Sequence, residues 1–189
     1  MAAVRLKITL RGVRPPVWRR LVVPASMTLA QLHSVFQTAM GWTDSHLHSF
    51  EVGGVLYGDV EEFDGPVGNE TRTRLSSVIG SASKFRYEYD FGDGWEHDVV
   101  VEQVLSTSVI TPSCVAGRRA CPPEDCGGPG GYAYLLDVLA DSDHEEHAHL
   151  AEWVGGSFDP EAFDVAETSD LLRLLGHAAP GRAGGPGIS

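Results

Sequence analysis

The residues best suited to chemistry in this chain gather in residues 87–98. Aromatic residues alternate on both sides of a short turn, and Asp90, Asp93 and His97 lie in or beside that turn. Carboxylates and imidazoles can bind a cation, transfer a proton or hold a polar ligand. The plainer interpretation is a hairpin turn in which aspartates accept backbone hydrogen bonds and glycines adopt positive φ.

A second candidate is the rigid segment Cys121-Pro122-Pro123-Glu124-Asp125-Cys126-Gly127-Gly128. With Cys114 it offers three thiols at the spacing C-x6-C-x4-C, and His97 is the candidate fourth ligand for zinc, which binds four such donors tetrahedrally. The spacing is not that of a C-x2-C zinc motif. Buried packing cysteines and a reactive thiol therefore stay open as alternatives. Three cysteines, an odd number, and no apolar leader indicate no disulfide framework.

A third hypothesis brings His48 together with the acidic turn. If the predicted strands are neighbours, His48, His97 and the two aspartates converge on one cleft and suit a metal-dependent, zinc-type hydrolase. The alternative is a half-buried histidine hydrogen-bonded to a turn carboxylate. The complete set of predicted ligand-binding residues is His48, Asp90, Asp93, Trp95, His97, Glu124 and Asp125.

Other histidines have plainer interpretations. His33 borders the apolar stripe of a predicted helix and is interpreted as structural. His144 and His147 are three residues apart with both glutamates between them, so they do not match the H-E-x-x-H metal motif. We interpret this segment, with His149, as a solvated helix face.

The charge distribution is strongly asymmetric. The net charge is −12, yet residues 1–43 carry six basic residues and no acid, whereas residues 120–172 carry 13 acids and no Lys or Arg. Solvated faces that attract one another are the simplest explanation. A basic nucleic-acid surface on the N-terminal sheet is less favoured, because the acidic chain as a whole repels phosphate. The N-terminus alternates apolar and polar residues rather than forming a leader, so a cytoplasmic protein without a membrane segment is expected.

The elements that position these residues follow from periodicity. Period-two alternation predicts strands near residues 4–10, 17–23, 46–52, 55–57, 85–89 and 95–101. A capping box at Thr28 and Gln31 and a terminating Gly41 bound a helix over residues 29–40. Residues 59–74 are predicted to be a loop, with one helical turn near residues 75–79.

The C-terminal part is predicted to be helical. Residues 111–131 read as a Pro/Gly/Cys loop, and helices are expected near residues 132–139, 147–154, 159–163 and 170–175. Asp159-Pro160 and Ser169 are the expected helix starts, and Gly176 is the expected end. We expect one domain over residues 3–176, sheet-rich over 3–110 and helical over 132–176, with a disordered tail at 177–189.

Several motifs together resemble the Ri-plasmid ORF-three-like family, whose members are also labelled insertion-sequence passenger proteins. The resemblance spans roughly residues 3–167. The matching pieces are Leu6-Lys7-Ile8-Thr9-Leu10, Pro15-Pro16-Val17-Trp18-Arg19-Arg20, His46-Leu47-His48-Ser49-Phe50, Tyr89-Asp90-Phe91-Gly92-Asp93-Gly94-Trp95-Glu96-His97, Cys121-Pro122-Pro123-Glu124-Asp125-Cys126-Gly127-Gly128, Trp153 and Phe158-Asp159-Pro160-Glu161-Ala162-Phe163-Asp164.

The resemblance implies an α+β roll-like domain and no established activity. The fold expected here is a mainly antiparallel sheet packed on a central helix, with a grasp-like start and a C-terminal helical segment. The family's resolvase-like label has no counterpart in these residues, since no recombinase signature is present. The leading hypothesis is a binding or accessory module that takes a protein or small-molecule partner at residues 90–97 and 121–128. The alternatives are the zinc-type hydrolase and a nucleic-acid-associated protein of mobile elements.

Overall fold

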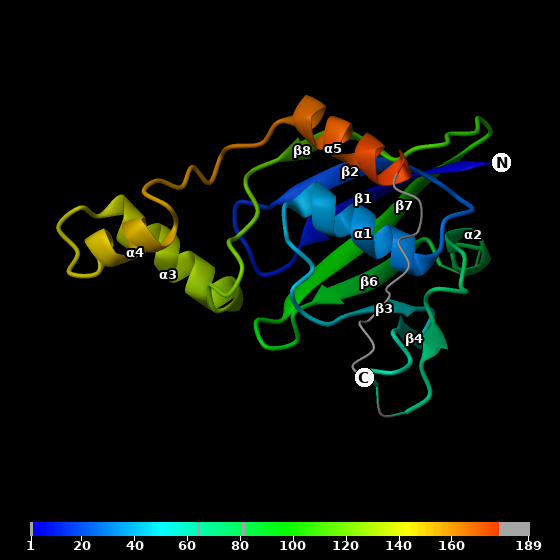
Figure 1. Cartoon of the computed structure of the whole chain (residues 1–189), viewed down its shortest axis with the longest axis horizontal. Coiled ribbons are helices and arrows are strands. Elements are labelled where there is room, and N and C mark those ends of the chain that lie inside the picture. Colours follow the sequence, from blue (N-terminus) through cyan, green and yellow to red (C-terminus); the bar gives the residue numbers. More distant parts are fainter. Residues whose placement is uncertain (1, 64, 81, 178–189) are drawn as a thin grey trace, which may run out of the picture.

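A single curved sheet supports the rest of the structure (Figure 1). The computed structural model describes residues 2–63, 65–80 and 82–177. The strands run across the sheet in the order β5-β4-β3-β6-β7-β1-β2-β8, and the pairing is antiparallel except between β4 and β5. Their bounds are β1 (Ala3–Leu10), β2 (Trp18–Pro24), β3 (His48–Val52), β4 (Val55–Gly58), β5 (Gly68–Asn69), β6 (Lys84–Tyr89), β7 (Trp95–Leu105) and β8 (Ser113–Arg118).

Helices cover one face of this sheet and extend beyond one end. In Figure 1, α1 crosses the sheet, α5 runs beside β8, and α3 and α4 project away from the sheet. The bounds are α1 (Leu29–Met40), α2 (Leu75–Val78), α3 (Gly128–Ala140), α4 (His147–Trp153) and α5 (Val165–His177). The predicted class, an α+β fold with a mainly antiparallel sheet packed on a central helix, is confirmed.

Helix α1 forms as its sequence predicts. Thr28 Oγ1 accepts from the Gln31 amide at 3.2 Å, and Gln31 Oε1 accepts from the Thr28 amide at 2.9 Å, which satisfies two free N–H groups at the helix start. Gly41 ends the helix with φ 101°, a left-handed conformation that suits glycine. The buried side chains of Leu32 and Phe36 then pack into the core against the sheet.

The two faces of the sheet have different chemistry. On β1, alternate apolar residues from Val4 to Leu10 are buried, and α1 and the sheet form the core between them. The opposite face carries ion pairs, including a bidentate contact from Arg20 to Glu102 at 2.7 and 2.8 Å. Only one face of the central strands is therefore apolar, which explains their period-two pattern.

The predicted loop over residues 111–131 is wrong in part. It contains edge strand β8, which pairs with β2, and the first turn of α3. The strand is short and contains Gly117, where an added Cβ would lie 2.3 Å from the Phe163 ring, so its composition hides its role. The start of α3 is a glycine-rich run with Pro129 in its first turn, a position that tolerates proline.

The C-terminal helix boundaries also differ from those predicted. Residues 159–163 form a turn, in which Asp159 Oδ1 accepts from the Glu161 amide, rather than a helix. Helix α5 begins earlier than predicted, because Asp164 Oδ1 accepts from the amides of Ala166 and Glu167. Ser169 is inside the helix and not its cap.

The remaining boundary predictions concern the ends of the chain. Gly176 does not end the last helix, because α5 continues to His177. The predicted disordered tail, apart from His177, lies outside the described residues, and the single domain over residues 3–176 stays a prediction. No helix in residues 2–63, 65–80 and 82–177 combines the length and hydropathy needed to cross a bilayer.

Candidate functional site

Three segments that are distant in sequence meet at one end of the sheet. Trp42 Nε1 donates to the Pro122 carbonyl at 3.0 Å, and Tyr89 Oη donates to Glu124 Oε1 at 3.1 Å. The Gly127 amide donates to Asp93 Oδ2 at 3.0 Å. We call residues 42–46, 89–93 and 122–127 the junction. The acidic turn and the cysteine-containing segment, both singled out from the sequence, are therefore adjacent.

The junction holds a histidine between two carboxylates. His46 Nε2 lies 3.1 Å from Asp125 Oδ1 and 3.6 Å from Asp90 Oδ2. Asp90 Oδ1 accepts from the Gly92 and Asp93 amides, so the fold of the turn directs its second oxygen toward His46. The Nε2 atom of His46 is buried and makes no hydrogen bond within the described residues, while the Asp125 side chain is 71% exposed.

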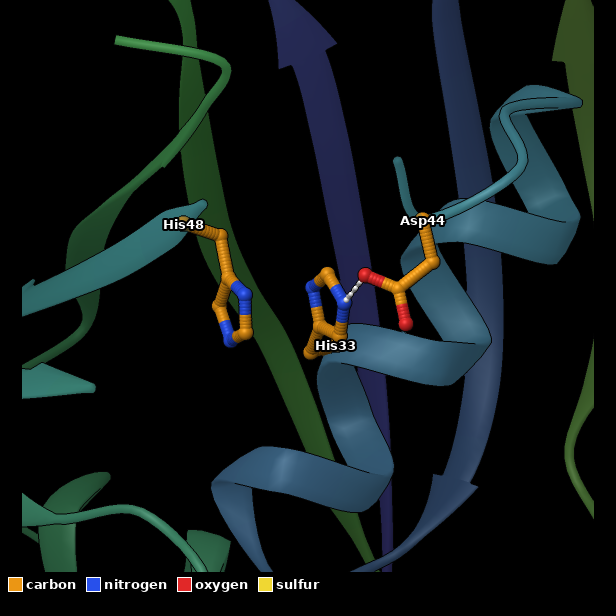
Figure 2. A group of neighbouring side chains, drawn as sticks. All are labelled: His33, Asp44 and His48. Atoms are coloured by element: carbon orange, nitrogen blue, oxygen red, sulfur yellow. Dashed lines mark hydrogen bonds and ion pairs between the residues drawn. The ribbon is translucent and has the colours of Figure 1, made fainter. Parts of the chain in front are cut away.

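A second cluster joins α1, the following segment and β3 (Figure 2). His33 Nε2 lies 2.6 Å from Asp44 Oδ1, and the rings of His33 and His48 stack with centroids 3.4 Å apart and planes 6° apart. His48 Nε2 lies 2.8 Å from Glu70 Oε2. The side chains of His48 and Glu70 are largely buried, whereas Asp44 is 58% exposed, so the cluster opens to solvent at Asp44.

A buried hydrogen-bond network fixes His33. Its Nδ1 lies 2.8 Å from Tyr87 Oη, which also accepts from Gln37 Nε2 at 3.0 Å. Gln37 Oε1 in turn accepts from the Asp44 amide at 2.9 Å. Burial lowers the pKa of His33, and the neighbouring His48 imidazole lowers it further. Burial also raises the pKa of Tyr87 well above its usual value, so burial favours the neutral form of both groups.

Aspartates in unusual backbone conformations recur in both clusters. Among the described residues four that are not glycine have positive φ, and three of them are Asp44 at 59°, Asp90 at 55° and Asp125 at 56°. Most L-residues avoid this region, whereas Asp and Asn tolerate it because their short side chains bond locally. Positive φ at these three carboxylates indicates that the fold specifies their placement.

The predicted residues separate into different environments. His48 belongs to the second cluster, Asp90 and Asp125 to the junction, and Asp93 and Glu124 hold the junction together. Among the described residues, the groups of three whose ligand atoms lie within 4.8 Å are His33–Asp44–His48 and His46–Asp90–Asp125. Neither group combines His48 with Asp90, Asp93 or His97, so the geometry gives the hydrolase hypothesis no support.

Trp95 and His97 belong to the core. Both have no exposed surface, and His97 packs edge-on against Trp42 with its Nδ1 3.3 Å from the Tyr87 carbonyl. Burial lowers the pKa of His97 to about 4. These two residues are thus enclosed beneath the junction, where they can shape it without touching solvent.

The three cysteines and His97 do not form a group with ligand atoms within 4.8 Å of one another, so zinc at the cysteines stays a prediction without support from the geometry of the described residues. Cys114 lies in β8, where its amide donates to Ser169 Oγ at 2.9 Å and its carbonyl accepts from the same hydroxyl. Neither of the two groups of ligand atoms contains a cysteine. Burial raises the pKa of Cys121 and raises that of Cys126 to about 12, with Asp93 adding to the shift. This environment favours the neutral thiol in Cys121 and Cys126, which argues against a reactive thiolate.

The arginines at the N-terminus are largely engaged within the protein. Arg19 is buried, and it donates to the Ala39 carbonyl at 2.8 Å and to the Arg118 carbonyl at 3.0 Å. Arg20 pairs with Glu102 and Arg11 pairs with Glu96. These contacts weaken the case for a basic surface. Nucleic-acid binding stays a prediction that no contact here tests.

Several members of the two clusters were missed from the sequence. The sequence predicts a structural role for His33 and no chemical role for Asp44, His46 or Glu70. The available signal was weak: His46 and His48 alternate at one strand start, and Asp44 follows the helix end by a few residues. Glu70 lies in a predicted loop, and its approach to His48 depends on tertiary packing, which local pattern does not reveal.

The fold and the two clusters define a class: an α+β protein with polar histidine–carboxylate groups at the end and on the helix-covered side of a mainly antiparallel sheet. Residues 2–167 match the family described as "Plasmid pRiA4b ORF-3-like protein", and the chain belongs to that family, as its motifs indicated.

Two relatives support the assignment. The uncharacterized protein y4hQ of Sinorhizobium fredii (strain NBRC 101917 / NGR234) is 46% identical over 176 residues, covering 90% of this chain and 91% of the relative. The crystal structure of MM3350, a protein of unknown function from Methanosarcina mazei Go1, is 39% identical and has a TM-score of 0.78, covering 88% of this chain and 97% of that chain.

Proposed function

We propose that this protein is a binding module whose site is the junction and whose ligand presents a cationic group, an ammonium or a guanidinium. The observation that carries the proposal is the arrangement of His46 between the carboxylates of Asp90 and Asp125, which come from different segments. A carboxylate pair with a partly exposed member attracts and orients a cation.

The surroundings favour the same ligand charge. Asp125 is the exposed member, so a ligand can reach it from solvent, whereas Asp90 is held in place by its own turn. Residues 120–172 carry 13 acids and no Lys or Arg, so the segment that contributes Asp125 adds negative potential around the site. Long-range attraction of this kind raises association rates and decreases with added salt.

The junction is also built to stay in place. Glu124 accepts from the Thr43 amide at 2.9 Å and from Tyr89 Oη, which links all three segments through one carboxylate. An added Cβ at Gly128 would lie 2.3 Å from the Asp93 carbonyl, so glycine permits the close approach of the two segments. A preorganised site of this kind loses less conformational entropy on binding.

The test is an NMR titration of the full chain with two cationic probes, a tetralysine peptide and spermidine. We expect shifts of the amide resonances of His46, Asp90 and Asp125. Asp90→Asn and Asp125→Asn remove charge while keeping a residue that tolerates positive φ. Each should weaken binding about two- to fivefold, the range of a partly exposed ion pair.

Asp59→Asn is the matched control. Asp59 is an exposed aspartate whose Oδ1 accepts from the Glu61 amide. The substitution therefore removes one turn carboxylate that lies outside the junction. It should leave the affinity unchanged apart from a small general charge effect. Equal affinity in wild type and in the folded Asp90→Asn/Asp125→Asn double variant would refute the assignment. The tetralysine and spermidine arms separate a peptide ligand from a small polyamine.

A further inference from the structure

We propose a metal site at the second cluster: His33, Asp44 and His48 bind one divalent transition-metal ion of the zinc type. This inference concerns a different group of residues from the junction and goes beyond the proposed function. One ligand atom from each of the three residues lies within 4.8 Å of the others. Figure 2 shows the three side chains converging from α1, the segment after it and the start of β3.

The donors define the class of ion. Two imidazoles and one carboxylate suit zinc and its neighbours among the transition metals, whereas magnesium and calcium prefer sites made of oxygen ligands. Three protein ligands with one side open to water are the usual arrangement of a zinc ion that keeps a free coordination position. Here the open side is at Asp44, the exposed member of the group.

The partners behind each imidazole leave one ring nitrogen directed toward the cluster, although in His33 this nitrogen now contacts Asp44. His33 Nδ1 forms a hydrogen bond with Tyr87 Oη, so Nε2 is the nitrogen that faces Asp44. His48 Nε2 forms a hydrogen bond with Glu70, so Nδ1 is the nitrogen that remains for the metal ion. Metal-bound histidines usually have this kind of outer hydrogen bond, which fixes the tautomer and the orientation of the ring.

The backbone supports the same assignment. Asp44 has a positive φ of 59°, and its amide is held by the buried side chain of Gln37, so its carboxylate is directed toward His33 by a specific local structure. Metal binding would replace the contact between His33 and Asp44, and it would also break the stacking of the His33 and His48 rings. An imidazole holds an ion in the plane of its ring, and these two rings are nearly parallel with centroids 3.4 Å apart, so one of them has to rotate. The donors would draw in to roughly 3.3 Å from one another, the separation that two bonds of about 2.0–2.1 Å make in a tetrahedron.

The experiment is a titration of the EDTA-treated and dialysed full chain with Zn²⁺, followed by calorimetry, with Co²⁺ as a spectroscopic probe and Mg²⁺ as the negative arm. We expect one Zn²⁺ per chain, no heat with Mg²⁺ and a cobalt spectrum without a thiolate charge-transfer band. Asp44→Asn and His48→Gln should each weaken Zn²⁺ binding at least tenfold. Glu70→Gln should weaken it by about tenfold, the effect of losing an outer partner.

The control variant replaces the three histidines of the other histidine-rich segment, with His144→Gln, His147→Gln and His149→Gln together. That variant should bind Zn²⁺ as the wild type does. Asp125→Asn should also bind normally, which separates failure of this proposal from failure of the junction. Absence of Zn²⁺ binding, loss of it in the triple variant, or unchanged binding in Asp44→Asn would overturn the proposal. Asp44 is exposed, so its variant decides the question even if His48→Gln fails to fold.

Discussion

At the scale of the residue, the most informative single side chain outside the clusters is His97. It has no exposed surface, and its Nε2 makes no hydrogen bond within the described residues. A protonated imidazole there would leave a buried donor unpaired, which agrees in direction with the pKa of about 4. The neutral ring is thus part of the fold beneath the junction.

This gives a prediction for stability against pH. The pKa of His97 is below that of an unfolded histidine, about 6.5, so the unfolded chain takes up a proton first as the pH falls. The contribution of His97 is fully present above about pH 6.5 and is lost between that value and about pH 4. Over this interval the group accounts for roughly 3 kcal/mol of the free energy of unfolding.

Urea unfolding measured at several pH values checks this expectation. His97→Phe removes the titrating group, so its free energy of unfolding should fall less steeply between pH 6.5 and pH 4 than that of the wild type. Exposed His149 supplies the matched control, because His149→Gln should keep the wild-type slope. Parallel curves for His97→Phe and wild type would contradict the assignment.

At the scale of the element, caps decide where the helices begin. The capping box of α1 was visible in the sequence because Thr28 and Gln31 have the required spacing just before an apolar stripe. The cap of α5 was assigned to Ser169 when it is Asp164. Ser169 instead binds the main chain of Cys114 in β8, a strand that the sequence did not reveal.

The capping role of Asp164 can be tested by mutation. Asp164→Ala removes the acceptor for two free amides of α5 and should lower the free energy of unfolding by about 1 kcal/mol. Asp164→Asn keeps an acceptor and should lose much less. Chemical denaturation of both variants gives the comparison. An equal loss in the two would indicate that charge, and not capping, is what Asp164 contributes.

Sequence periodicity predicted the elements that have one buried face and one solvated face. Strands β1, β3, β6 and β7 and helix α1 belong to this group. It could not predict β8, because an edge strand that packs under Phe163 requires Gly117 and shows no alternation. The adjacency of residues 90–93 and 121–128 was predicted, but the partner His46 depends on how the segment after α1 crosses them.

At the scale of the whole molecule, opposite charges are placed close together. Basic residues on β1 and β2 meet acids on β7, as Arg20 meets Glu102, and buried Arg119 pairs with Glu161 near the C-terminal helices. Arg11 and Arg20 pair with acids on β7, which lies outside residues 120–172, so these contacts neutralise charge locally and do not join the basic and acidic segments of the sequence. The remaining acids account for the net charge of −12.

That balance predicts the outcome for nucleic acid. We expect no duplex DNA binding in a fluorescence titration at about 50 mM salt, since a chain with a net charge of −12 is repelled by phosphate. Arg20→Ala should change nothing in this assay, because its guanidinium is already held by Glu102. An affinity that falls linearly with the logarithm of salt concentration would restore the nucleic-acid hypothesis.

Asp44, Asp90 and Asp125 have left-handed backbone conformations, so the charge of the side chain and the conformation of the backbone can be tested separately at these positions. Glutamate preserves the charge of aspartate but has poor access to that backbone region, while asparagine and glycine preserve the backbone and lose the charge. In a library of all single substitutions, abundance and ligand retention would therefore rank replacements at these positions in different orders. Such a divergence identifies carboxylates kept for what they bind rather than for the shape they allow.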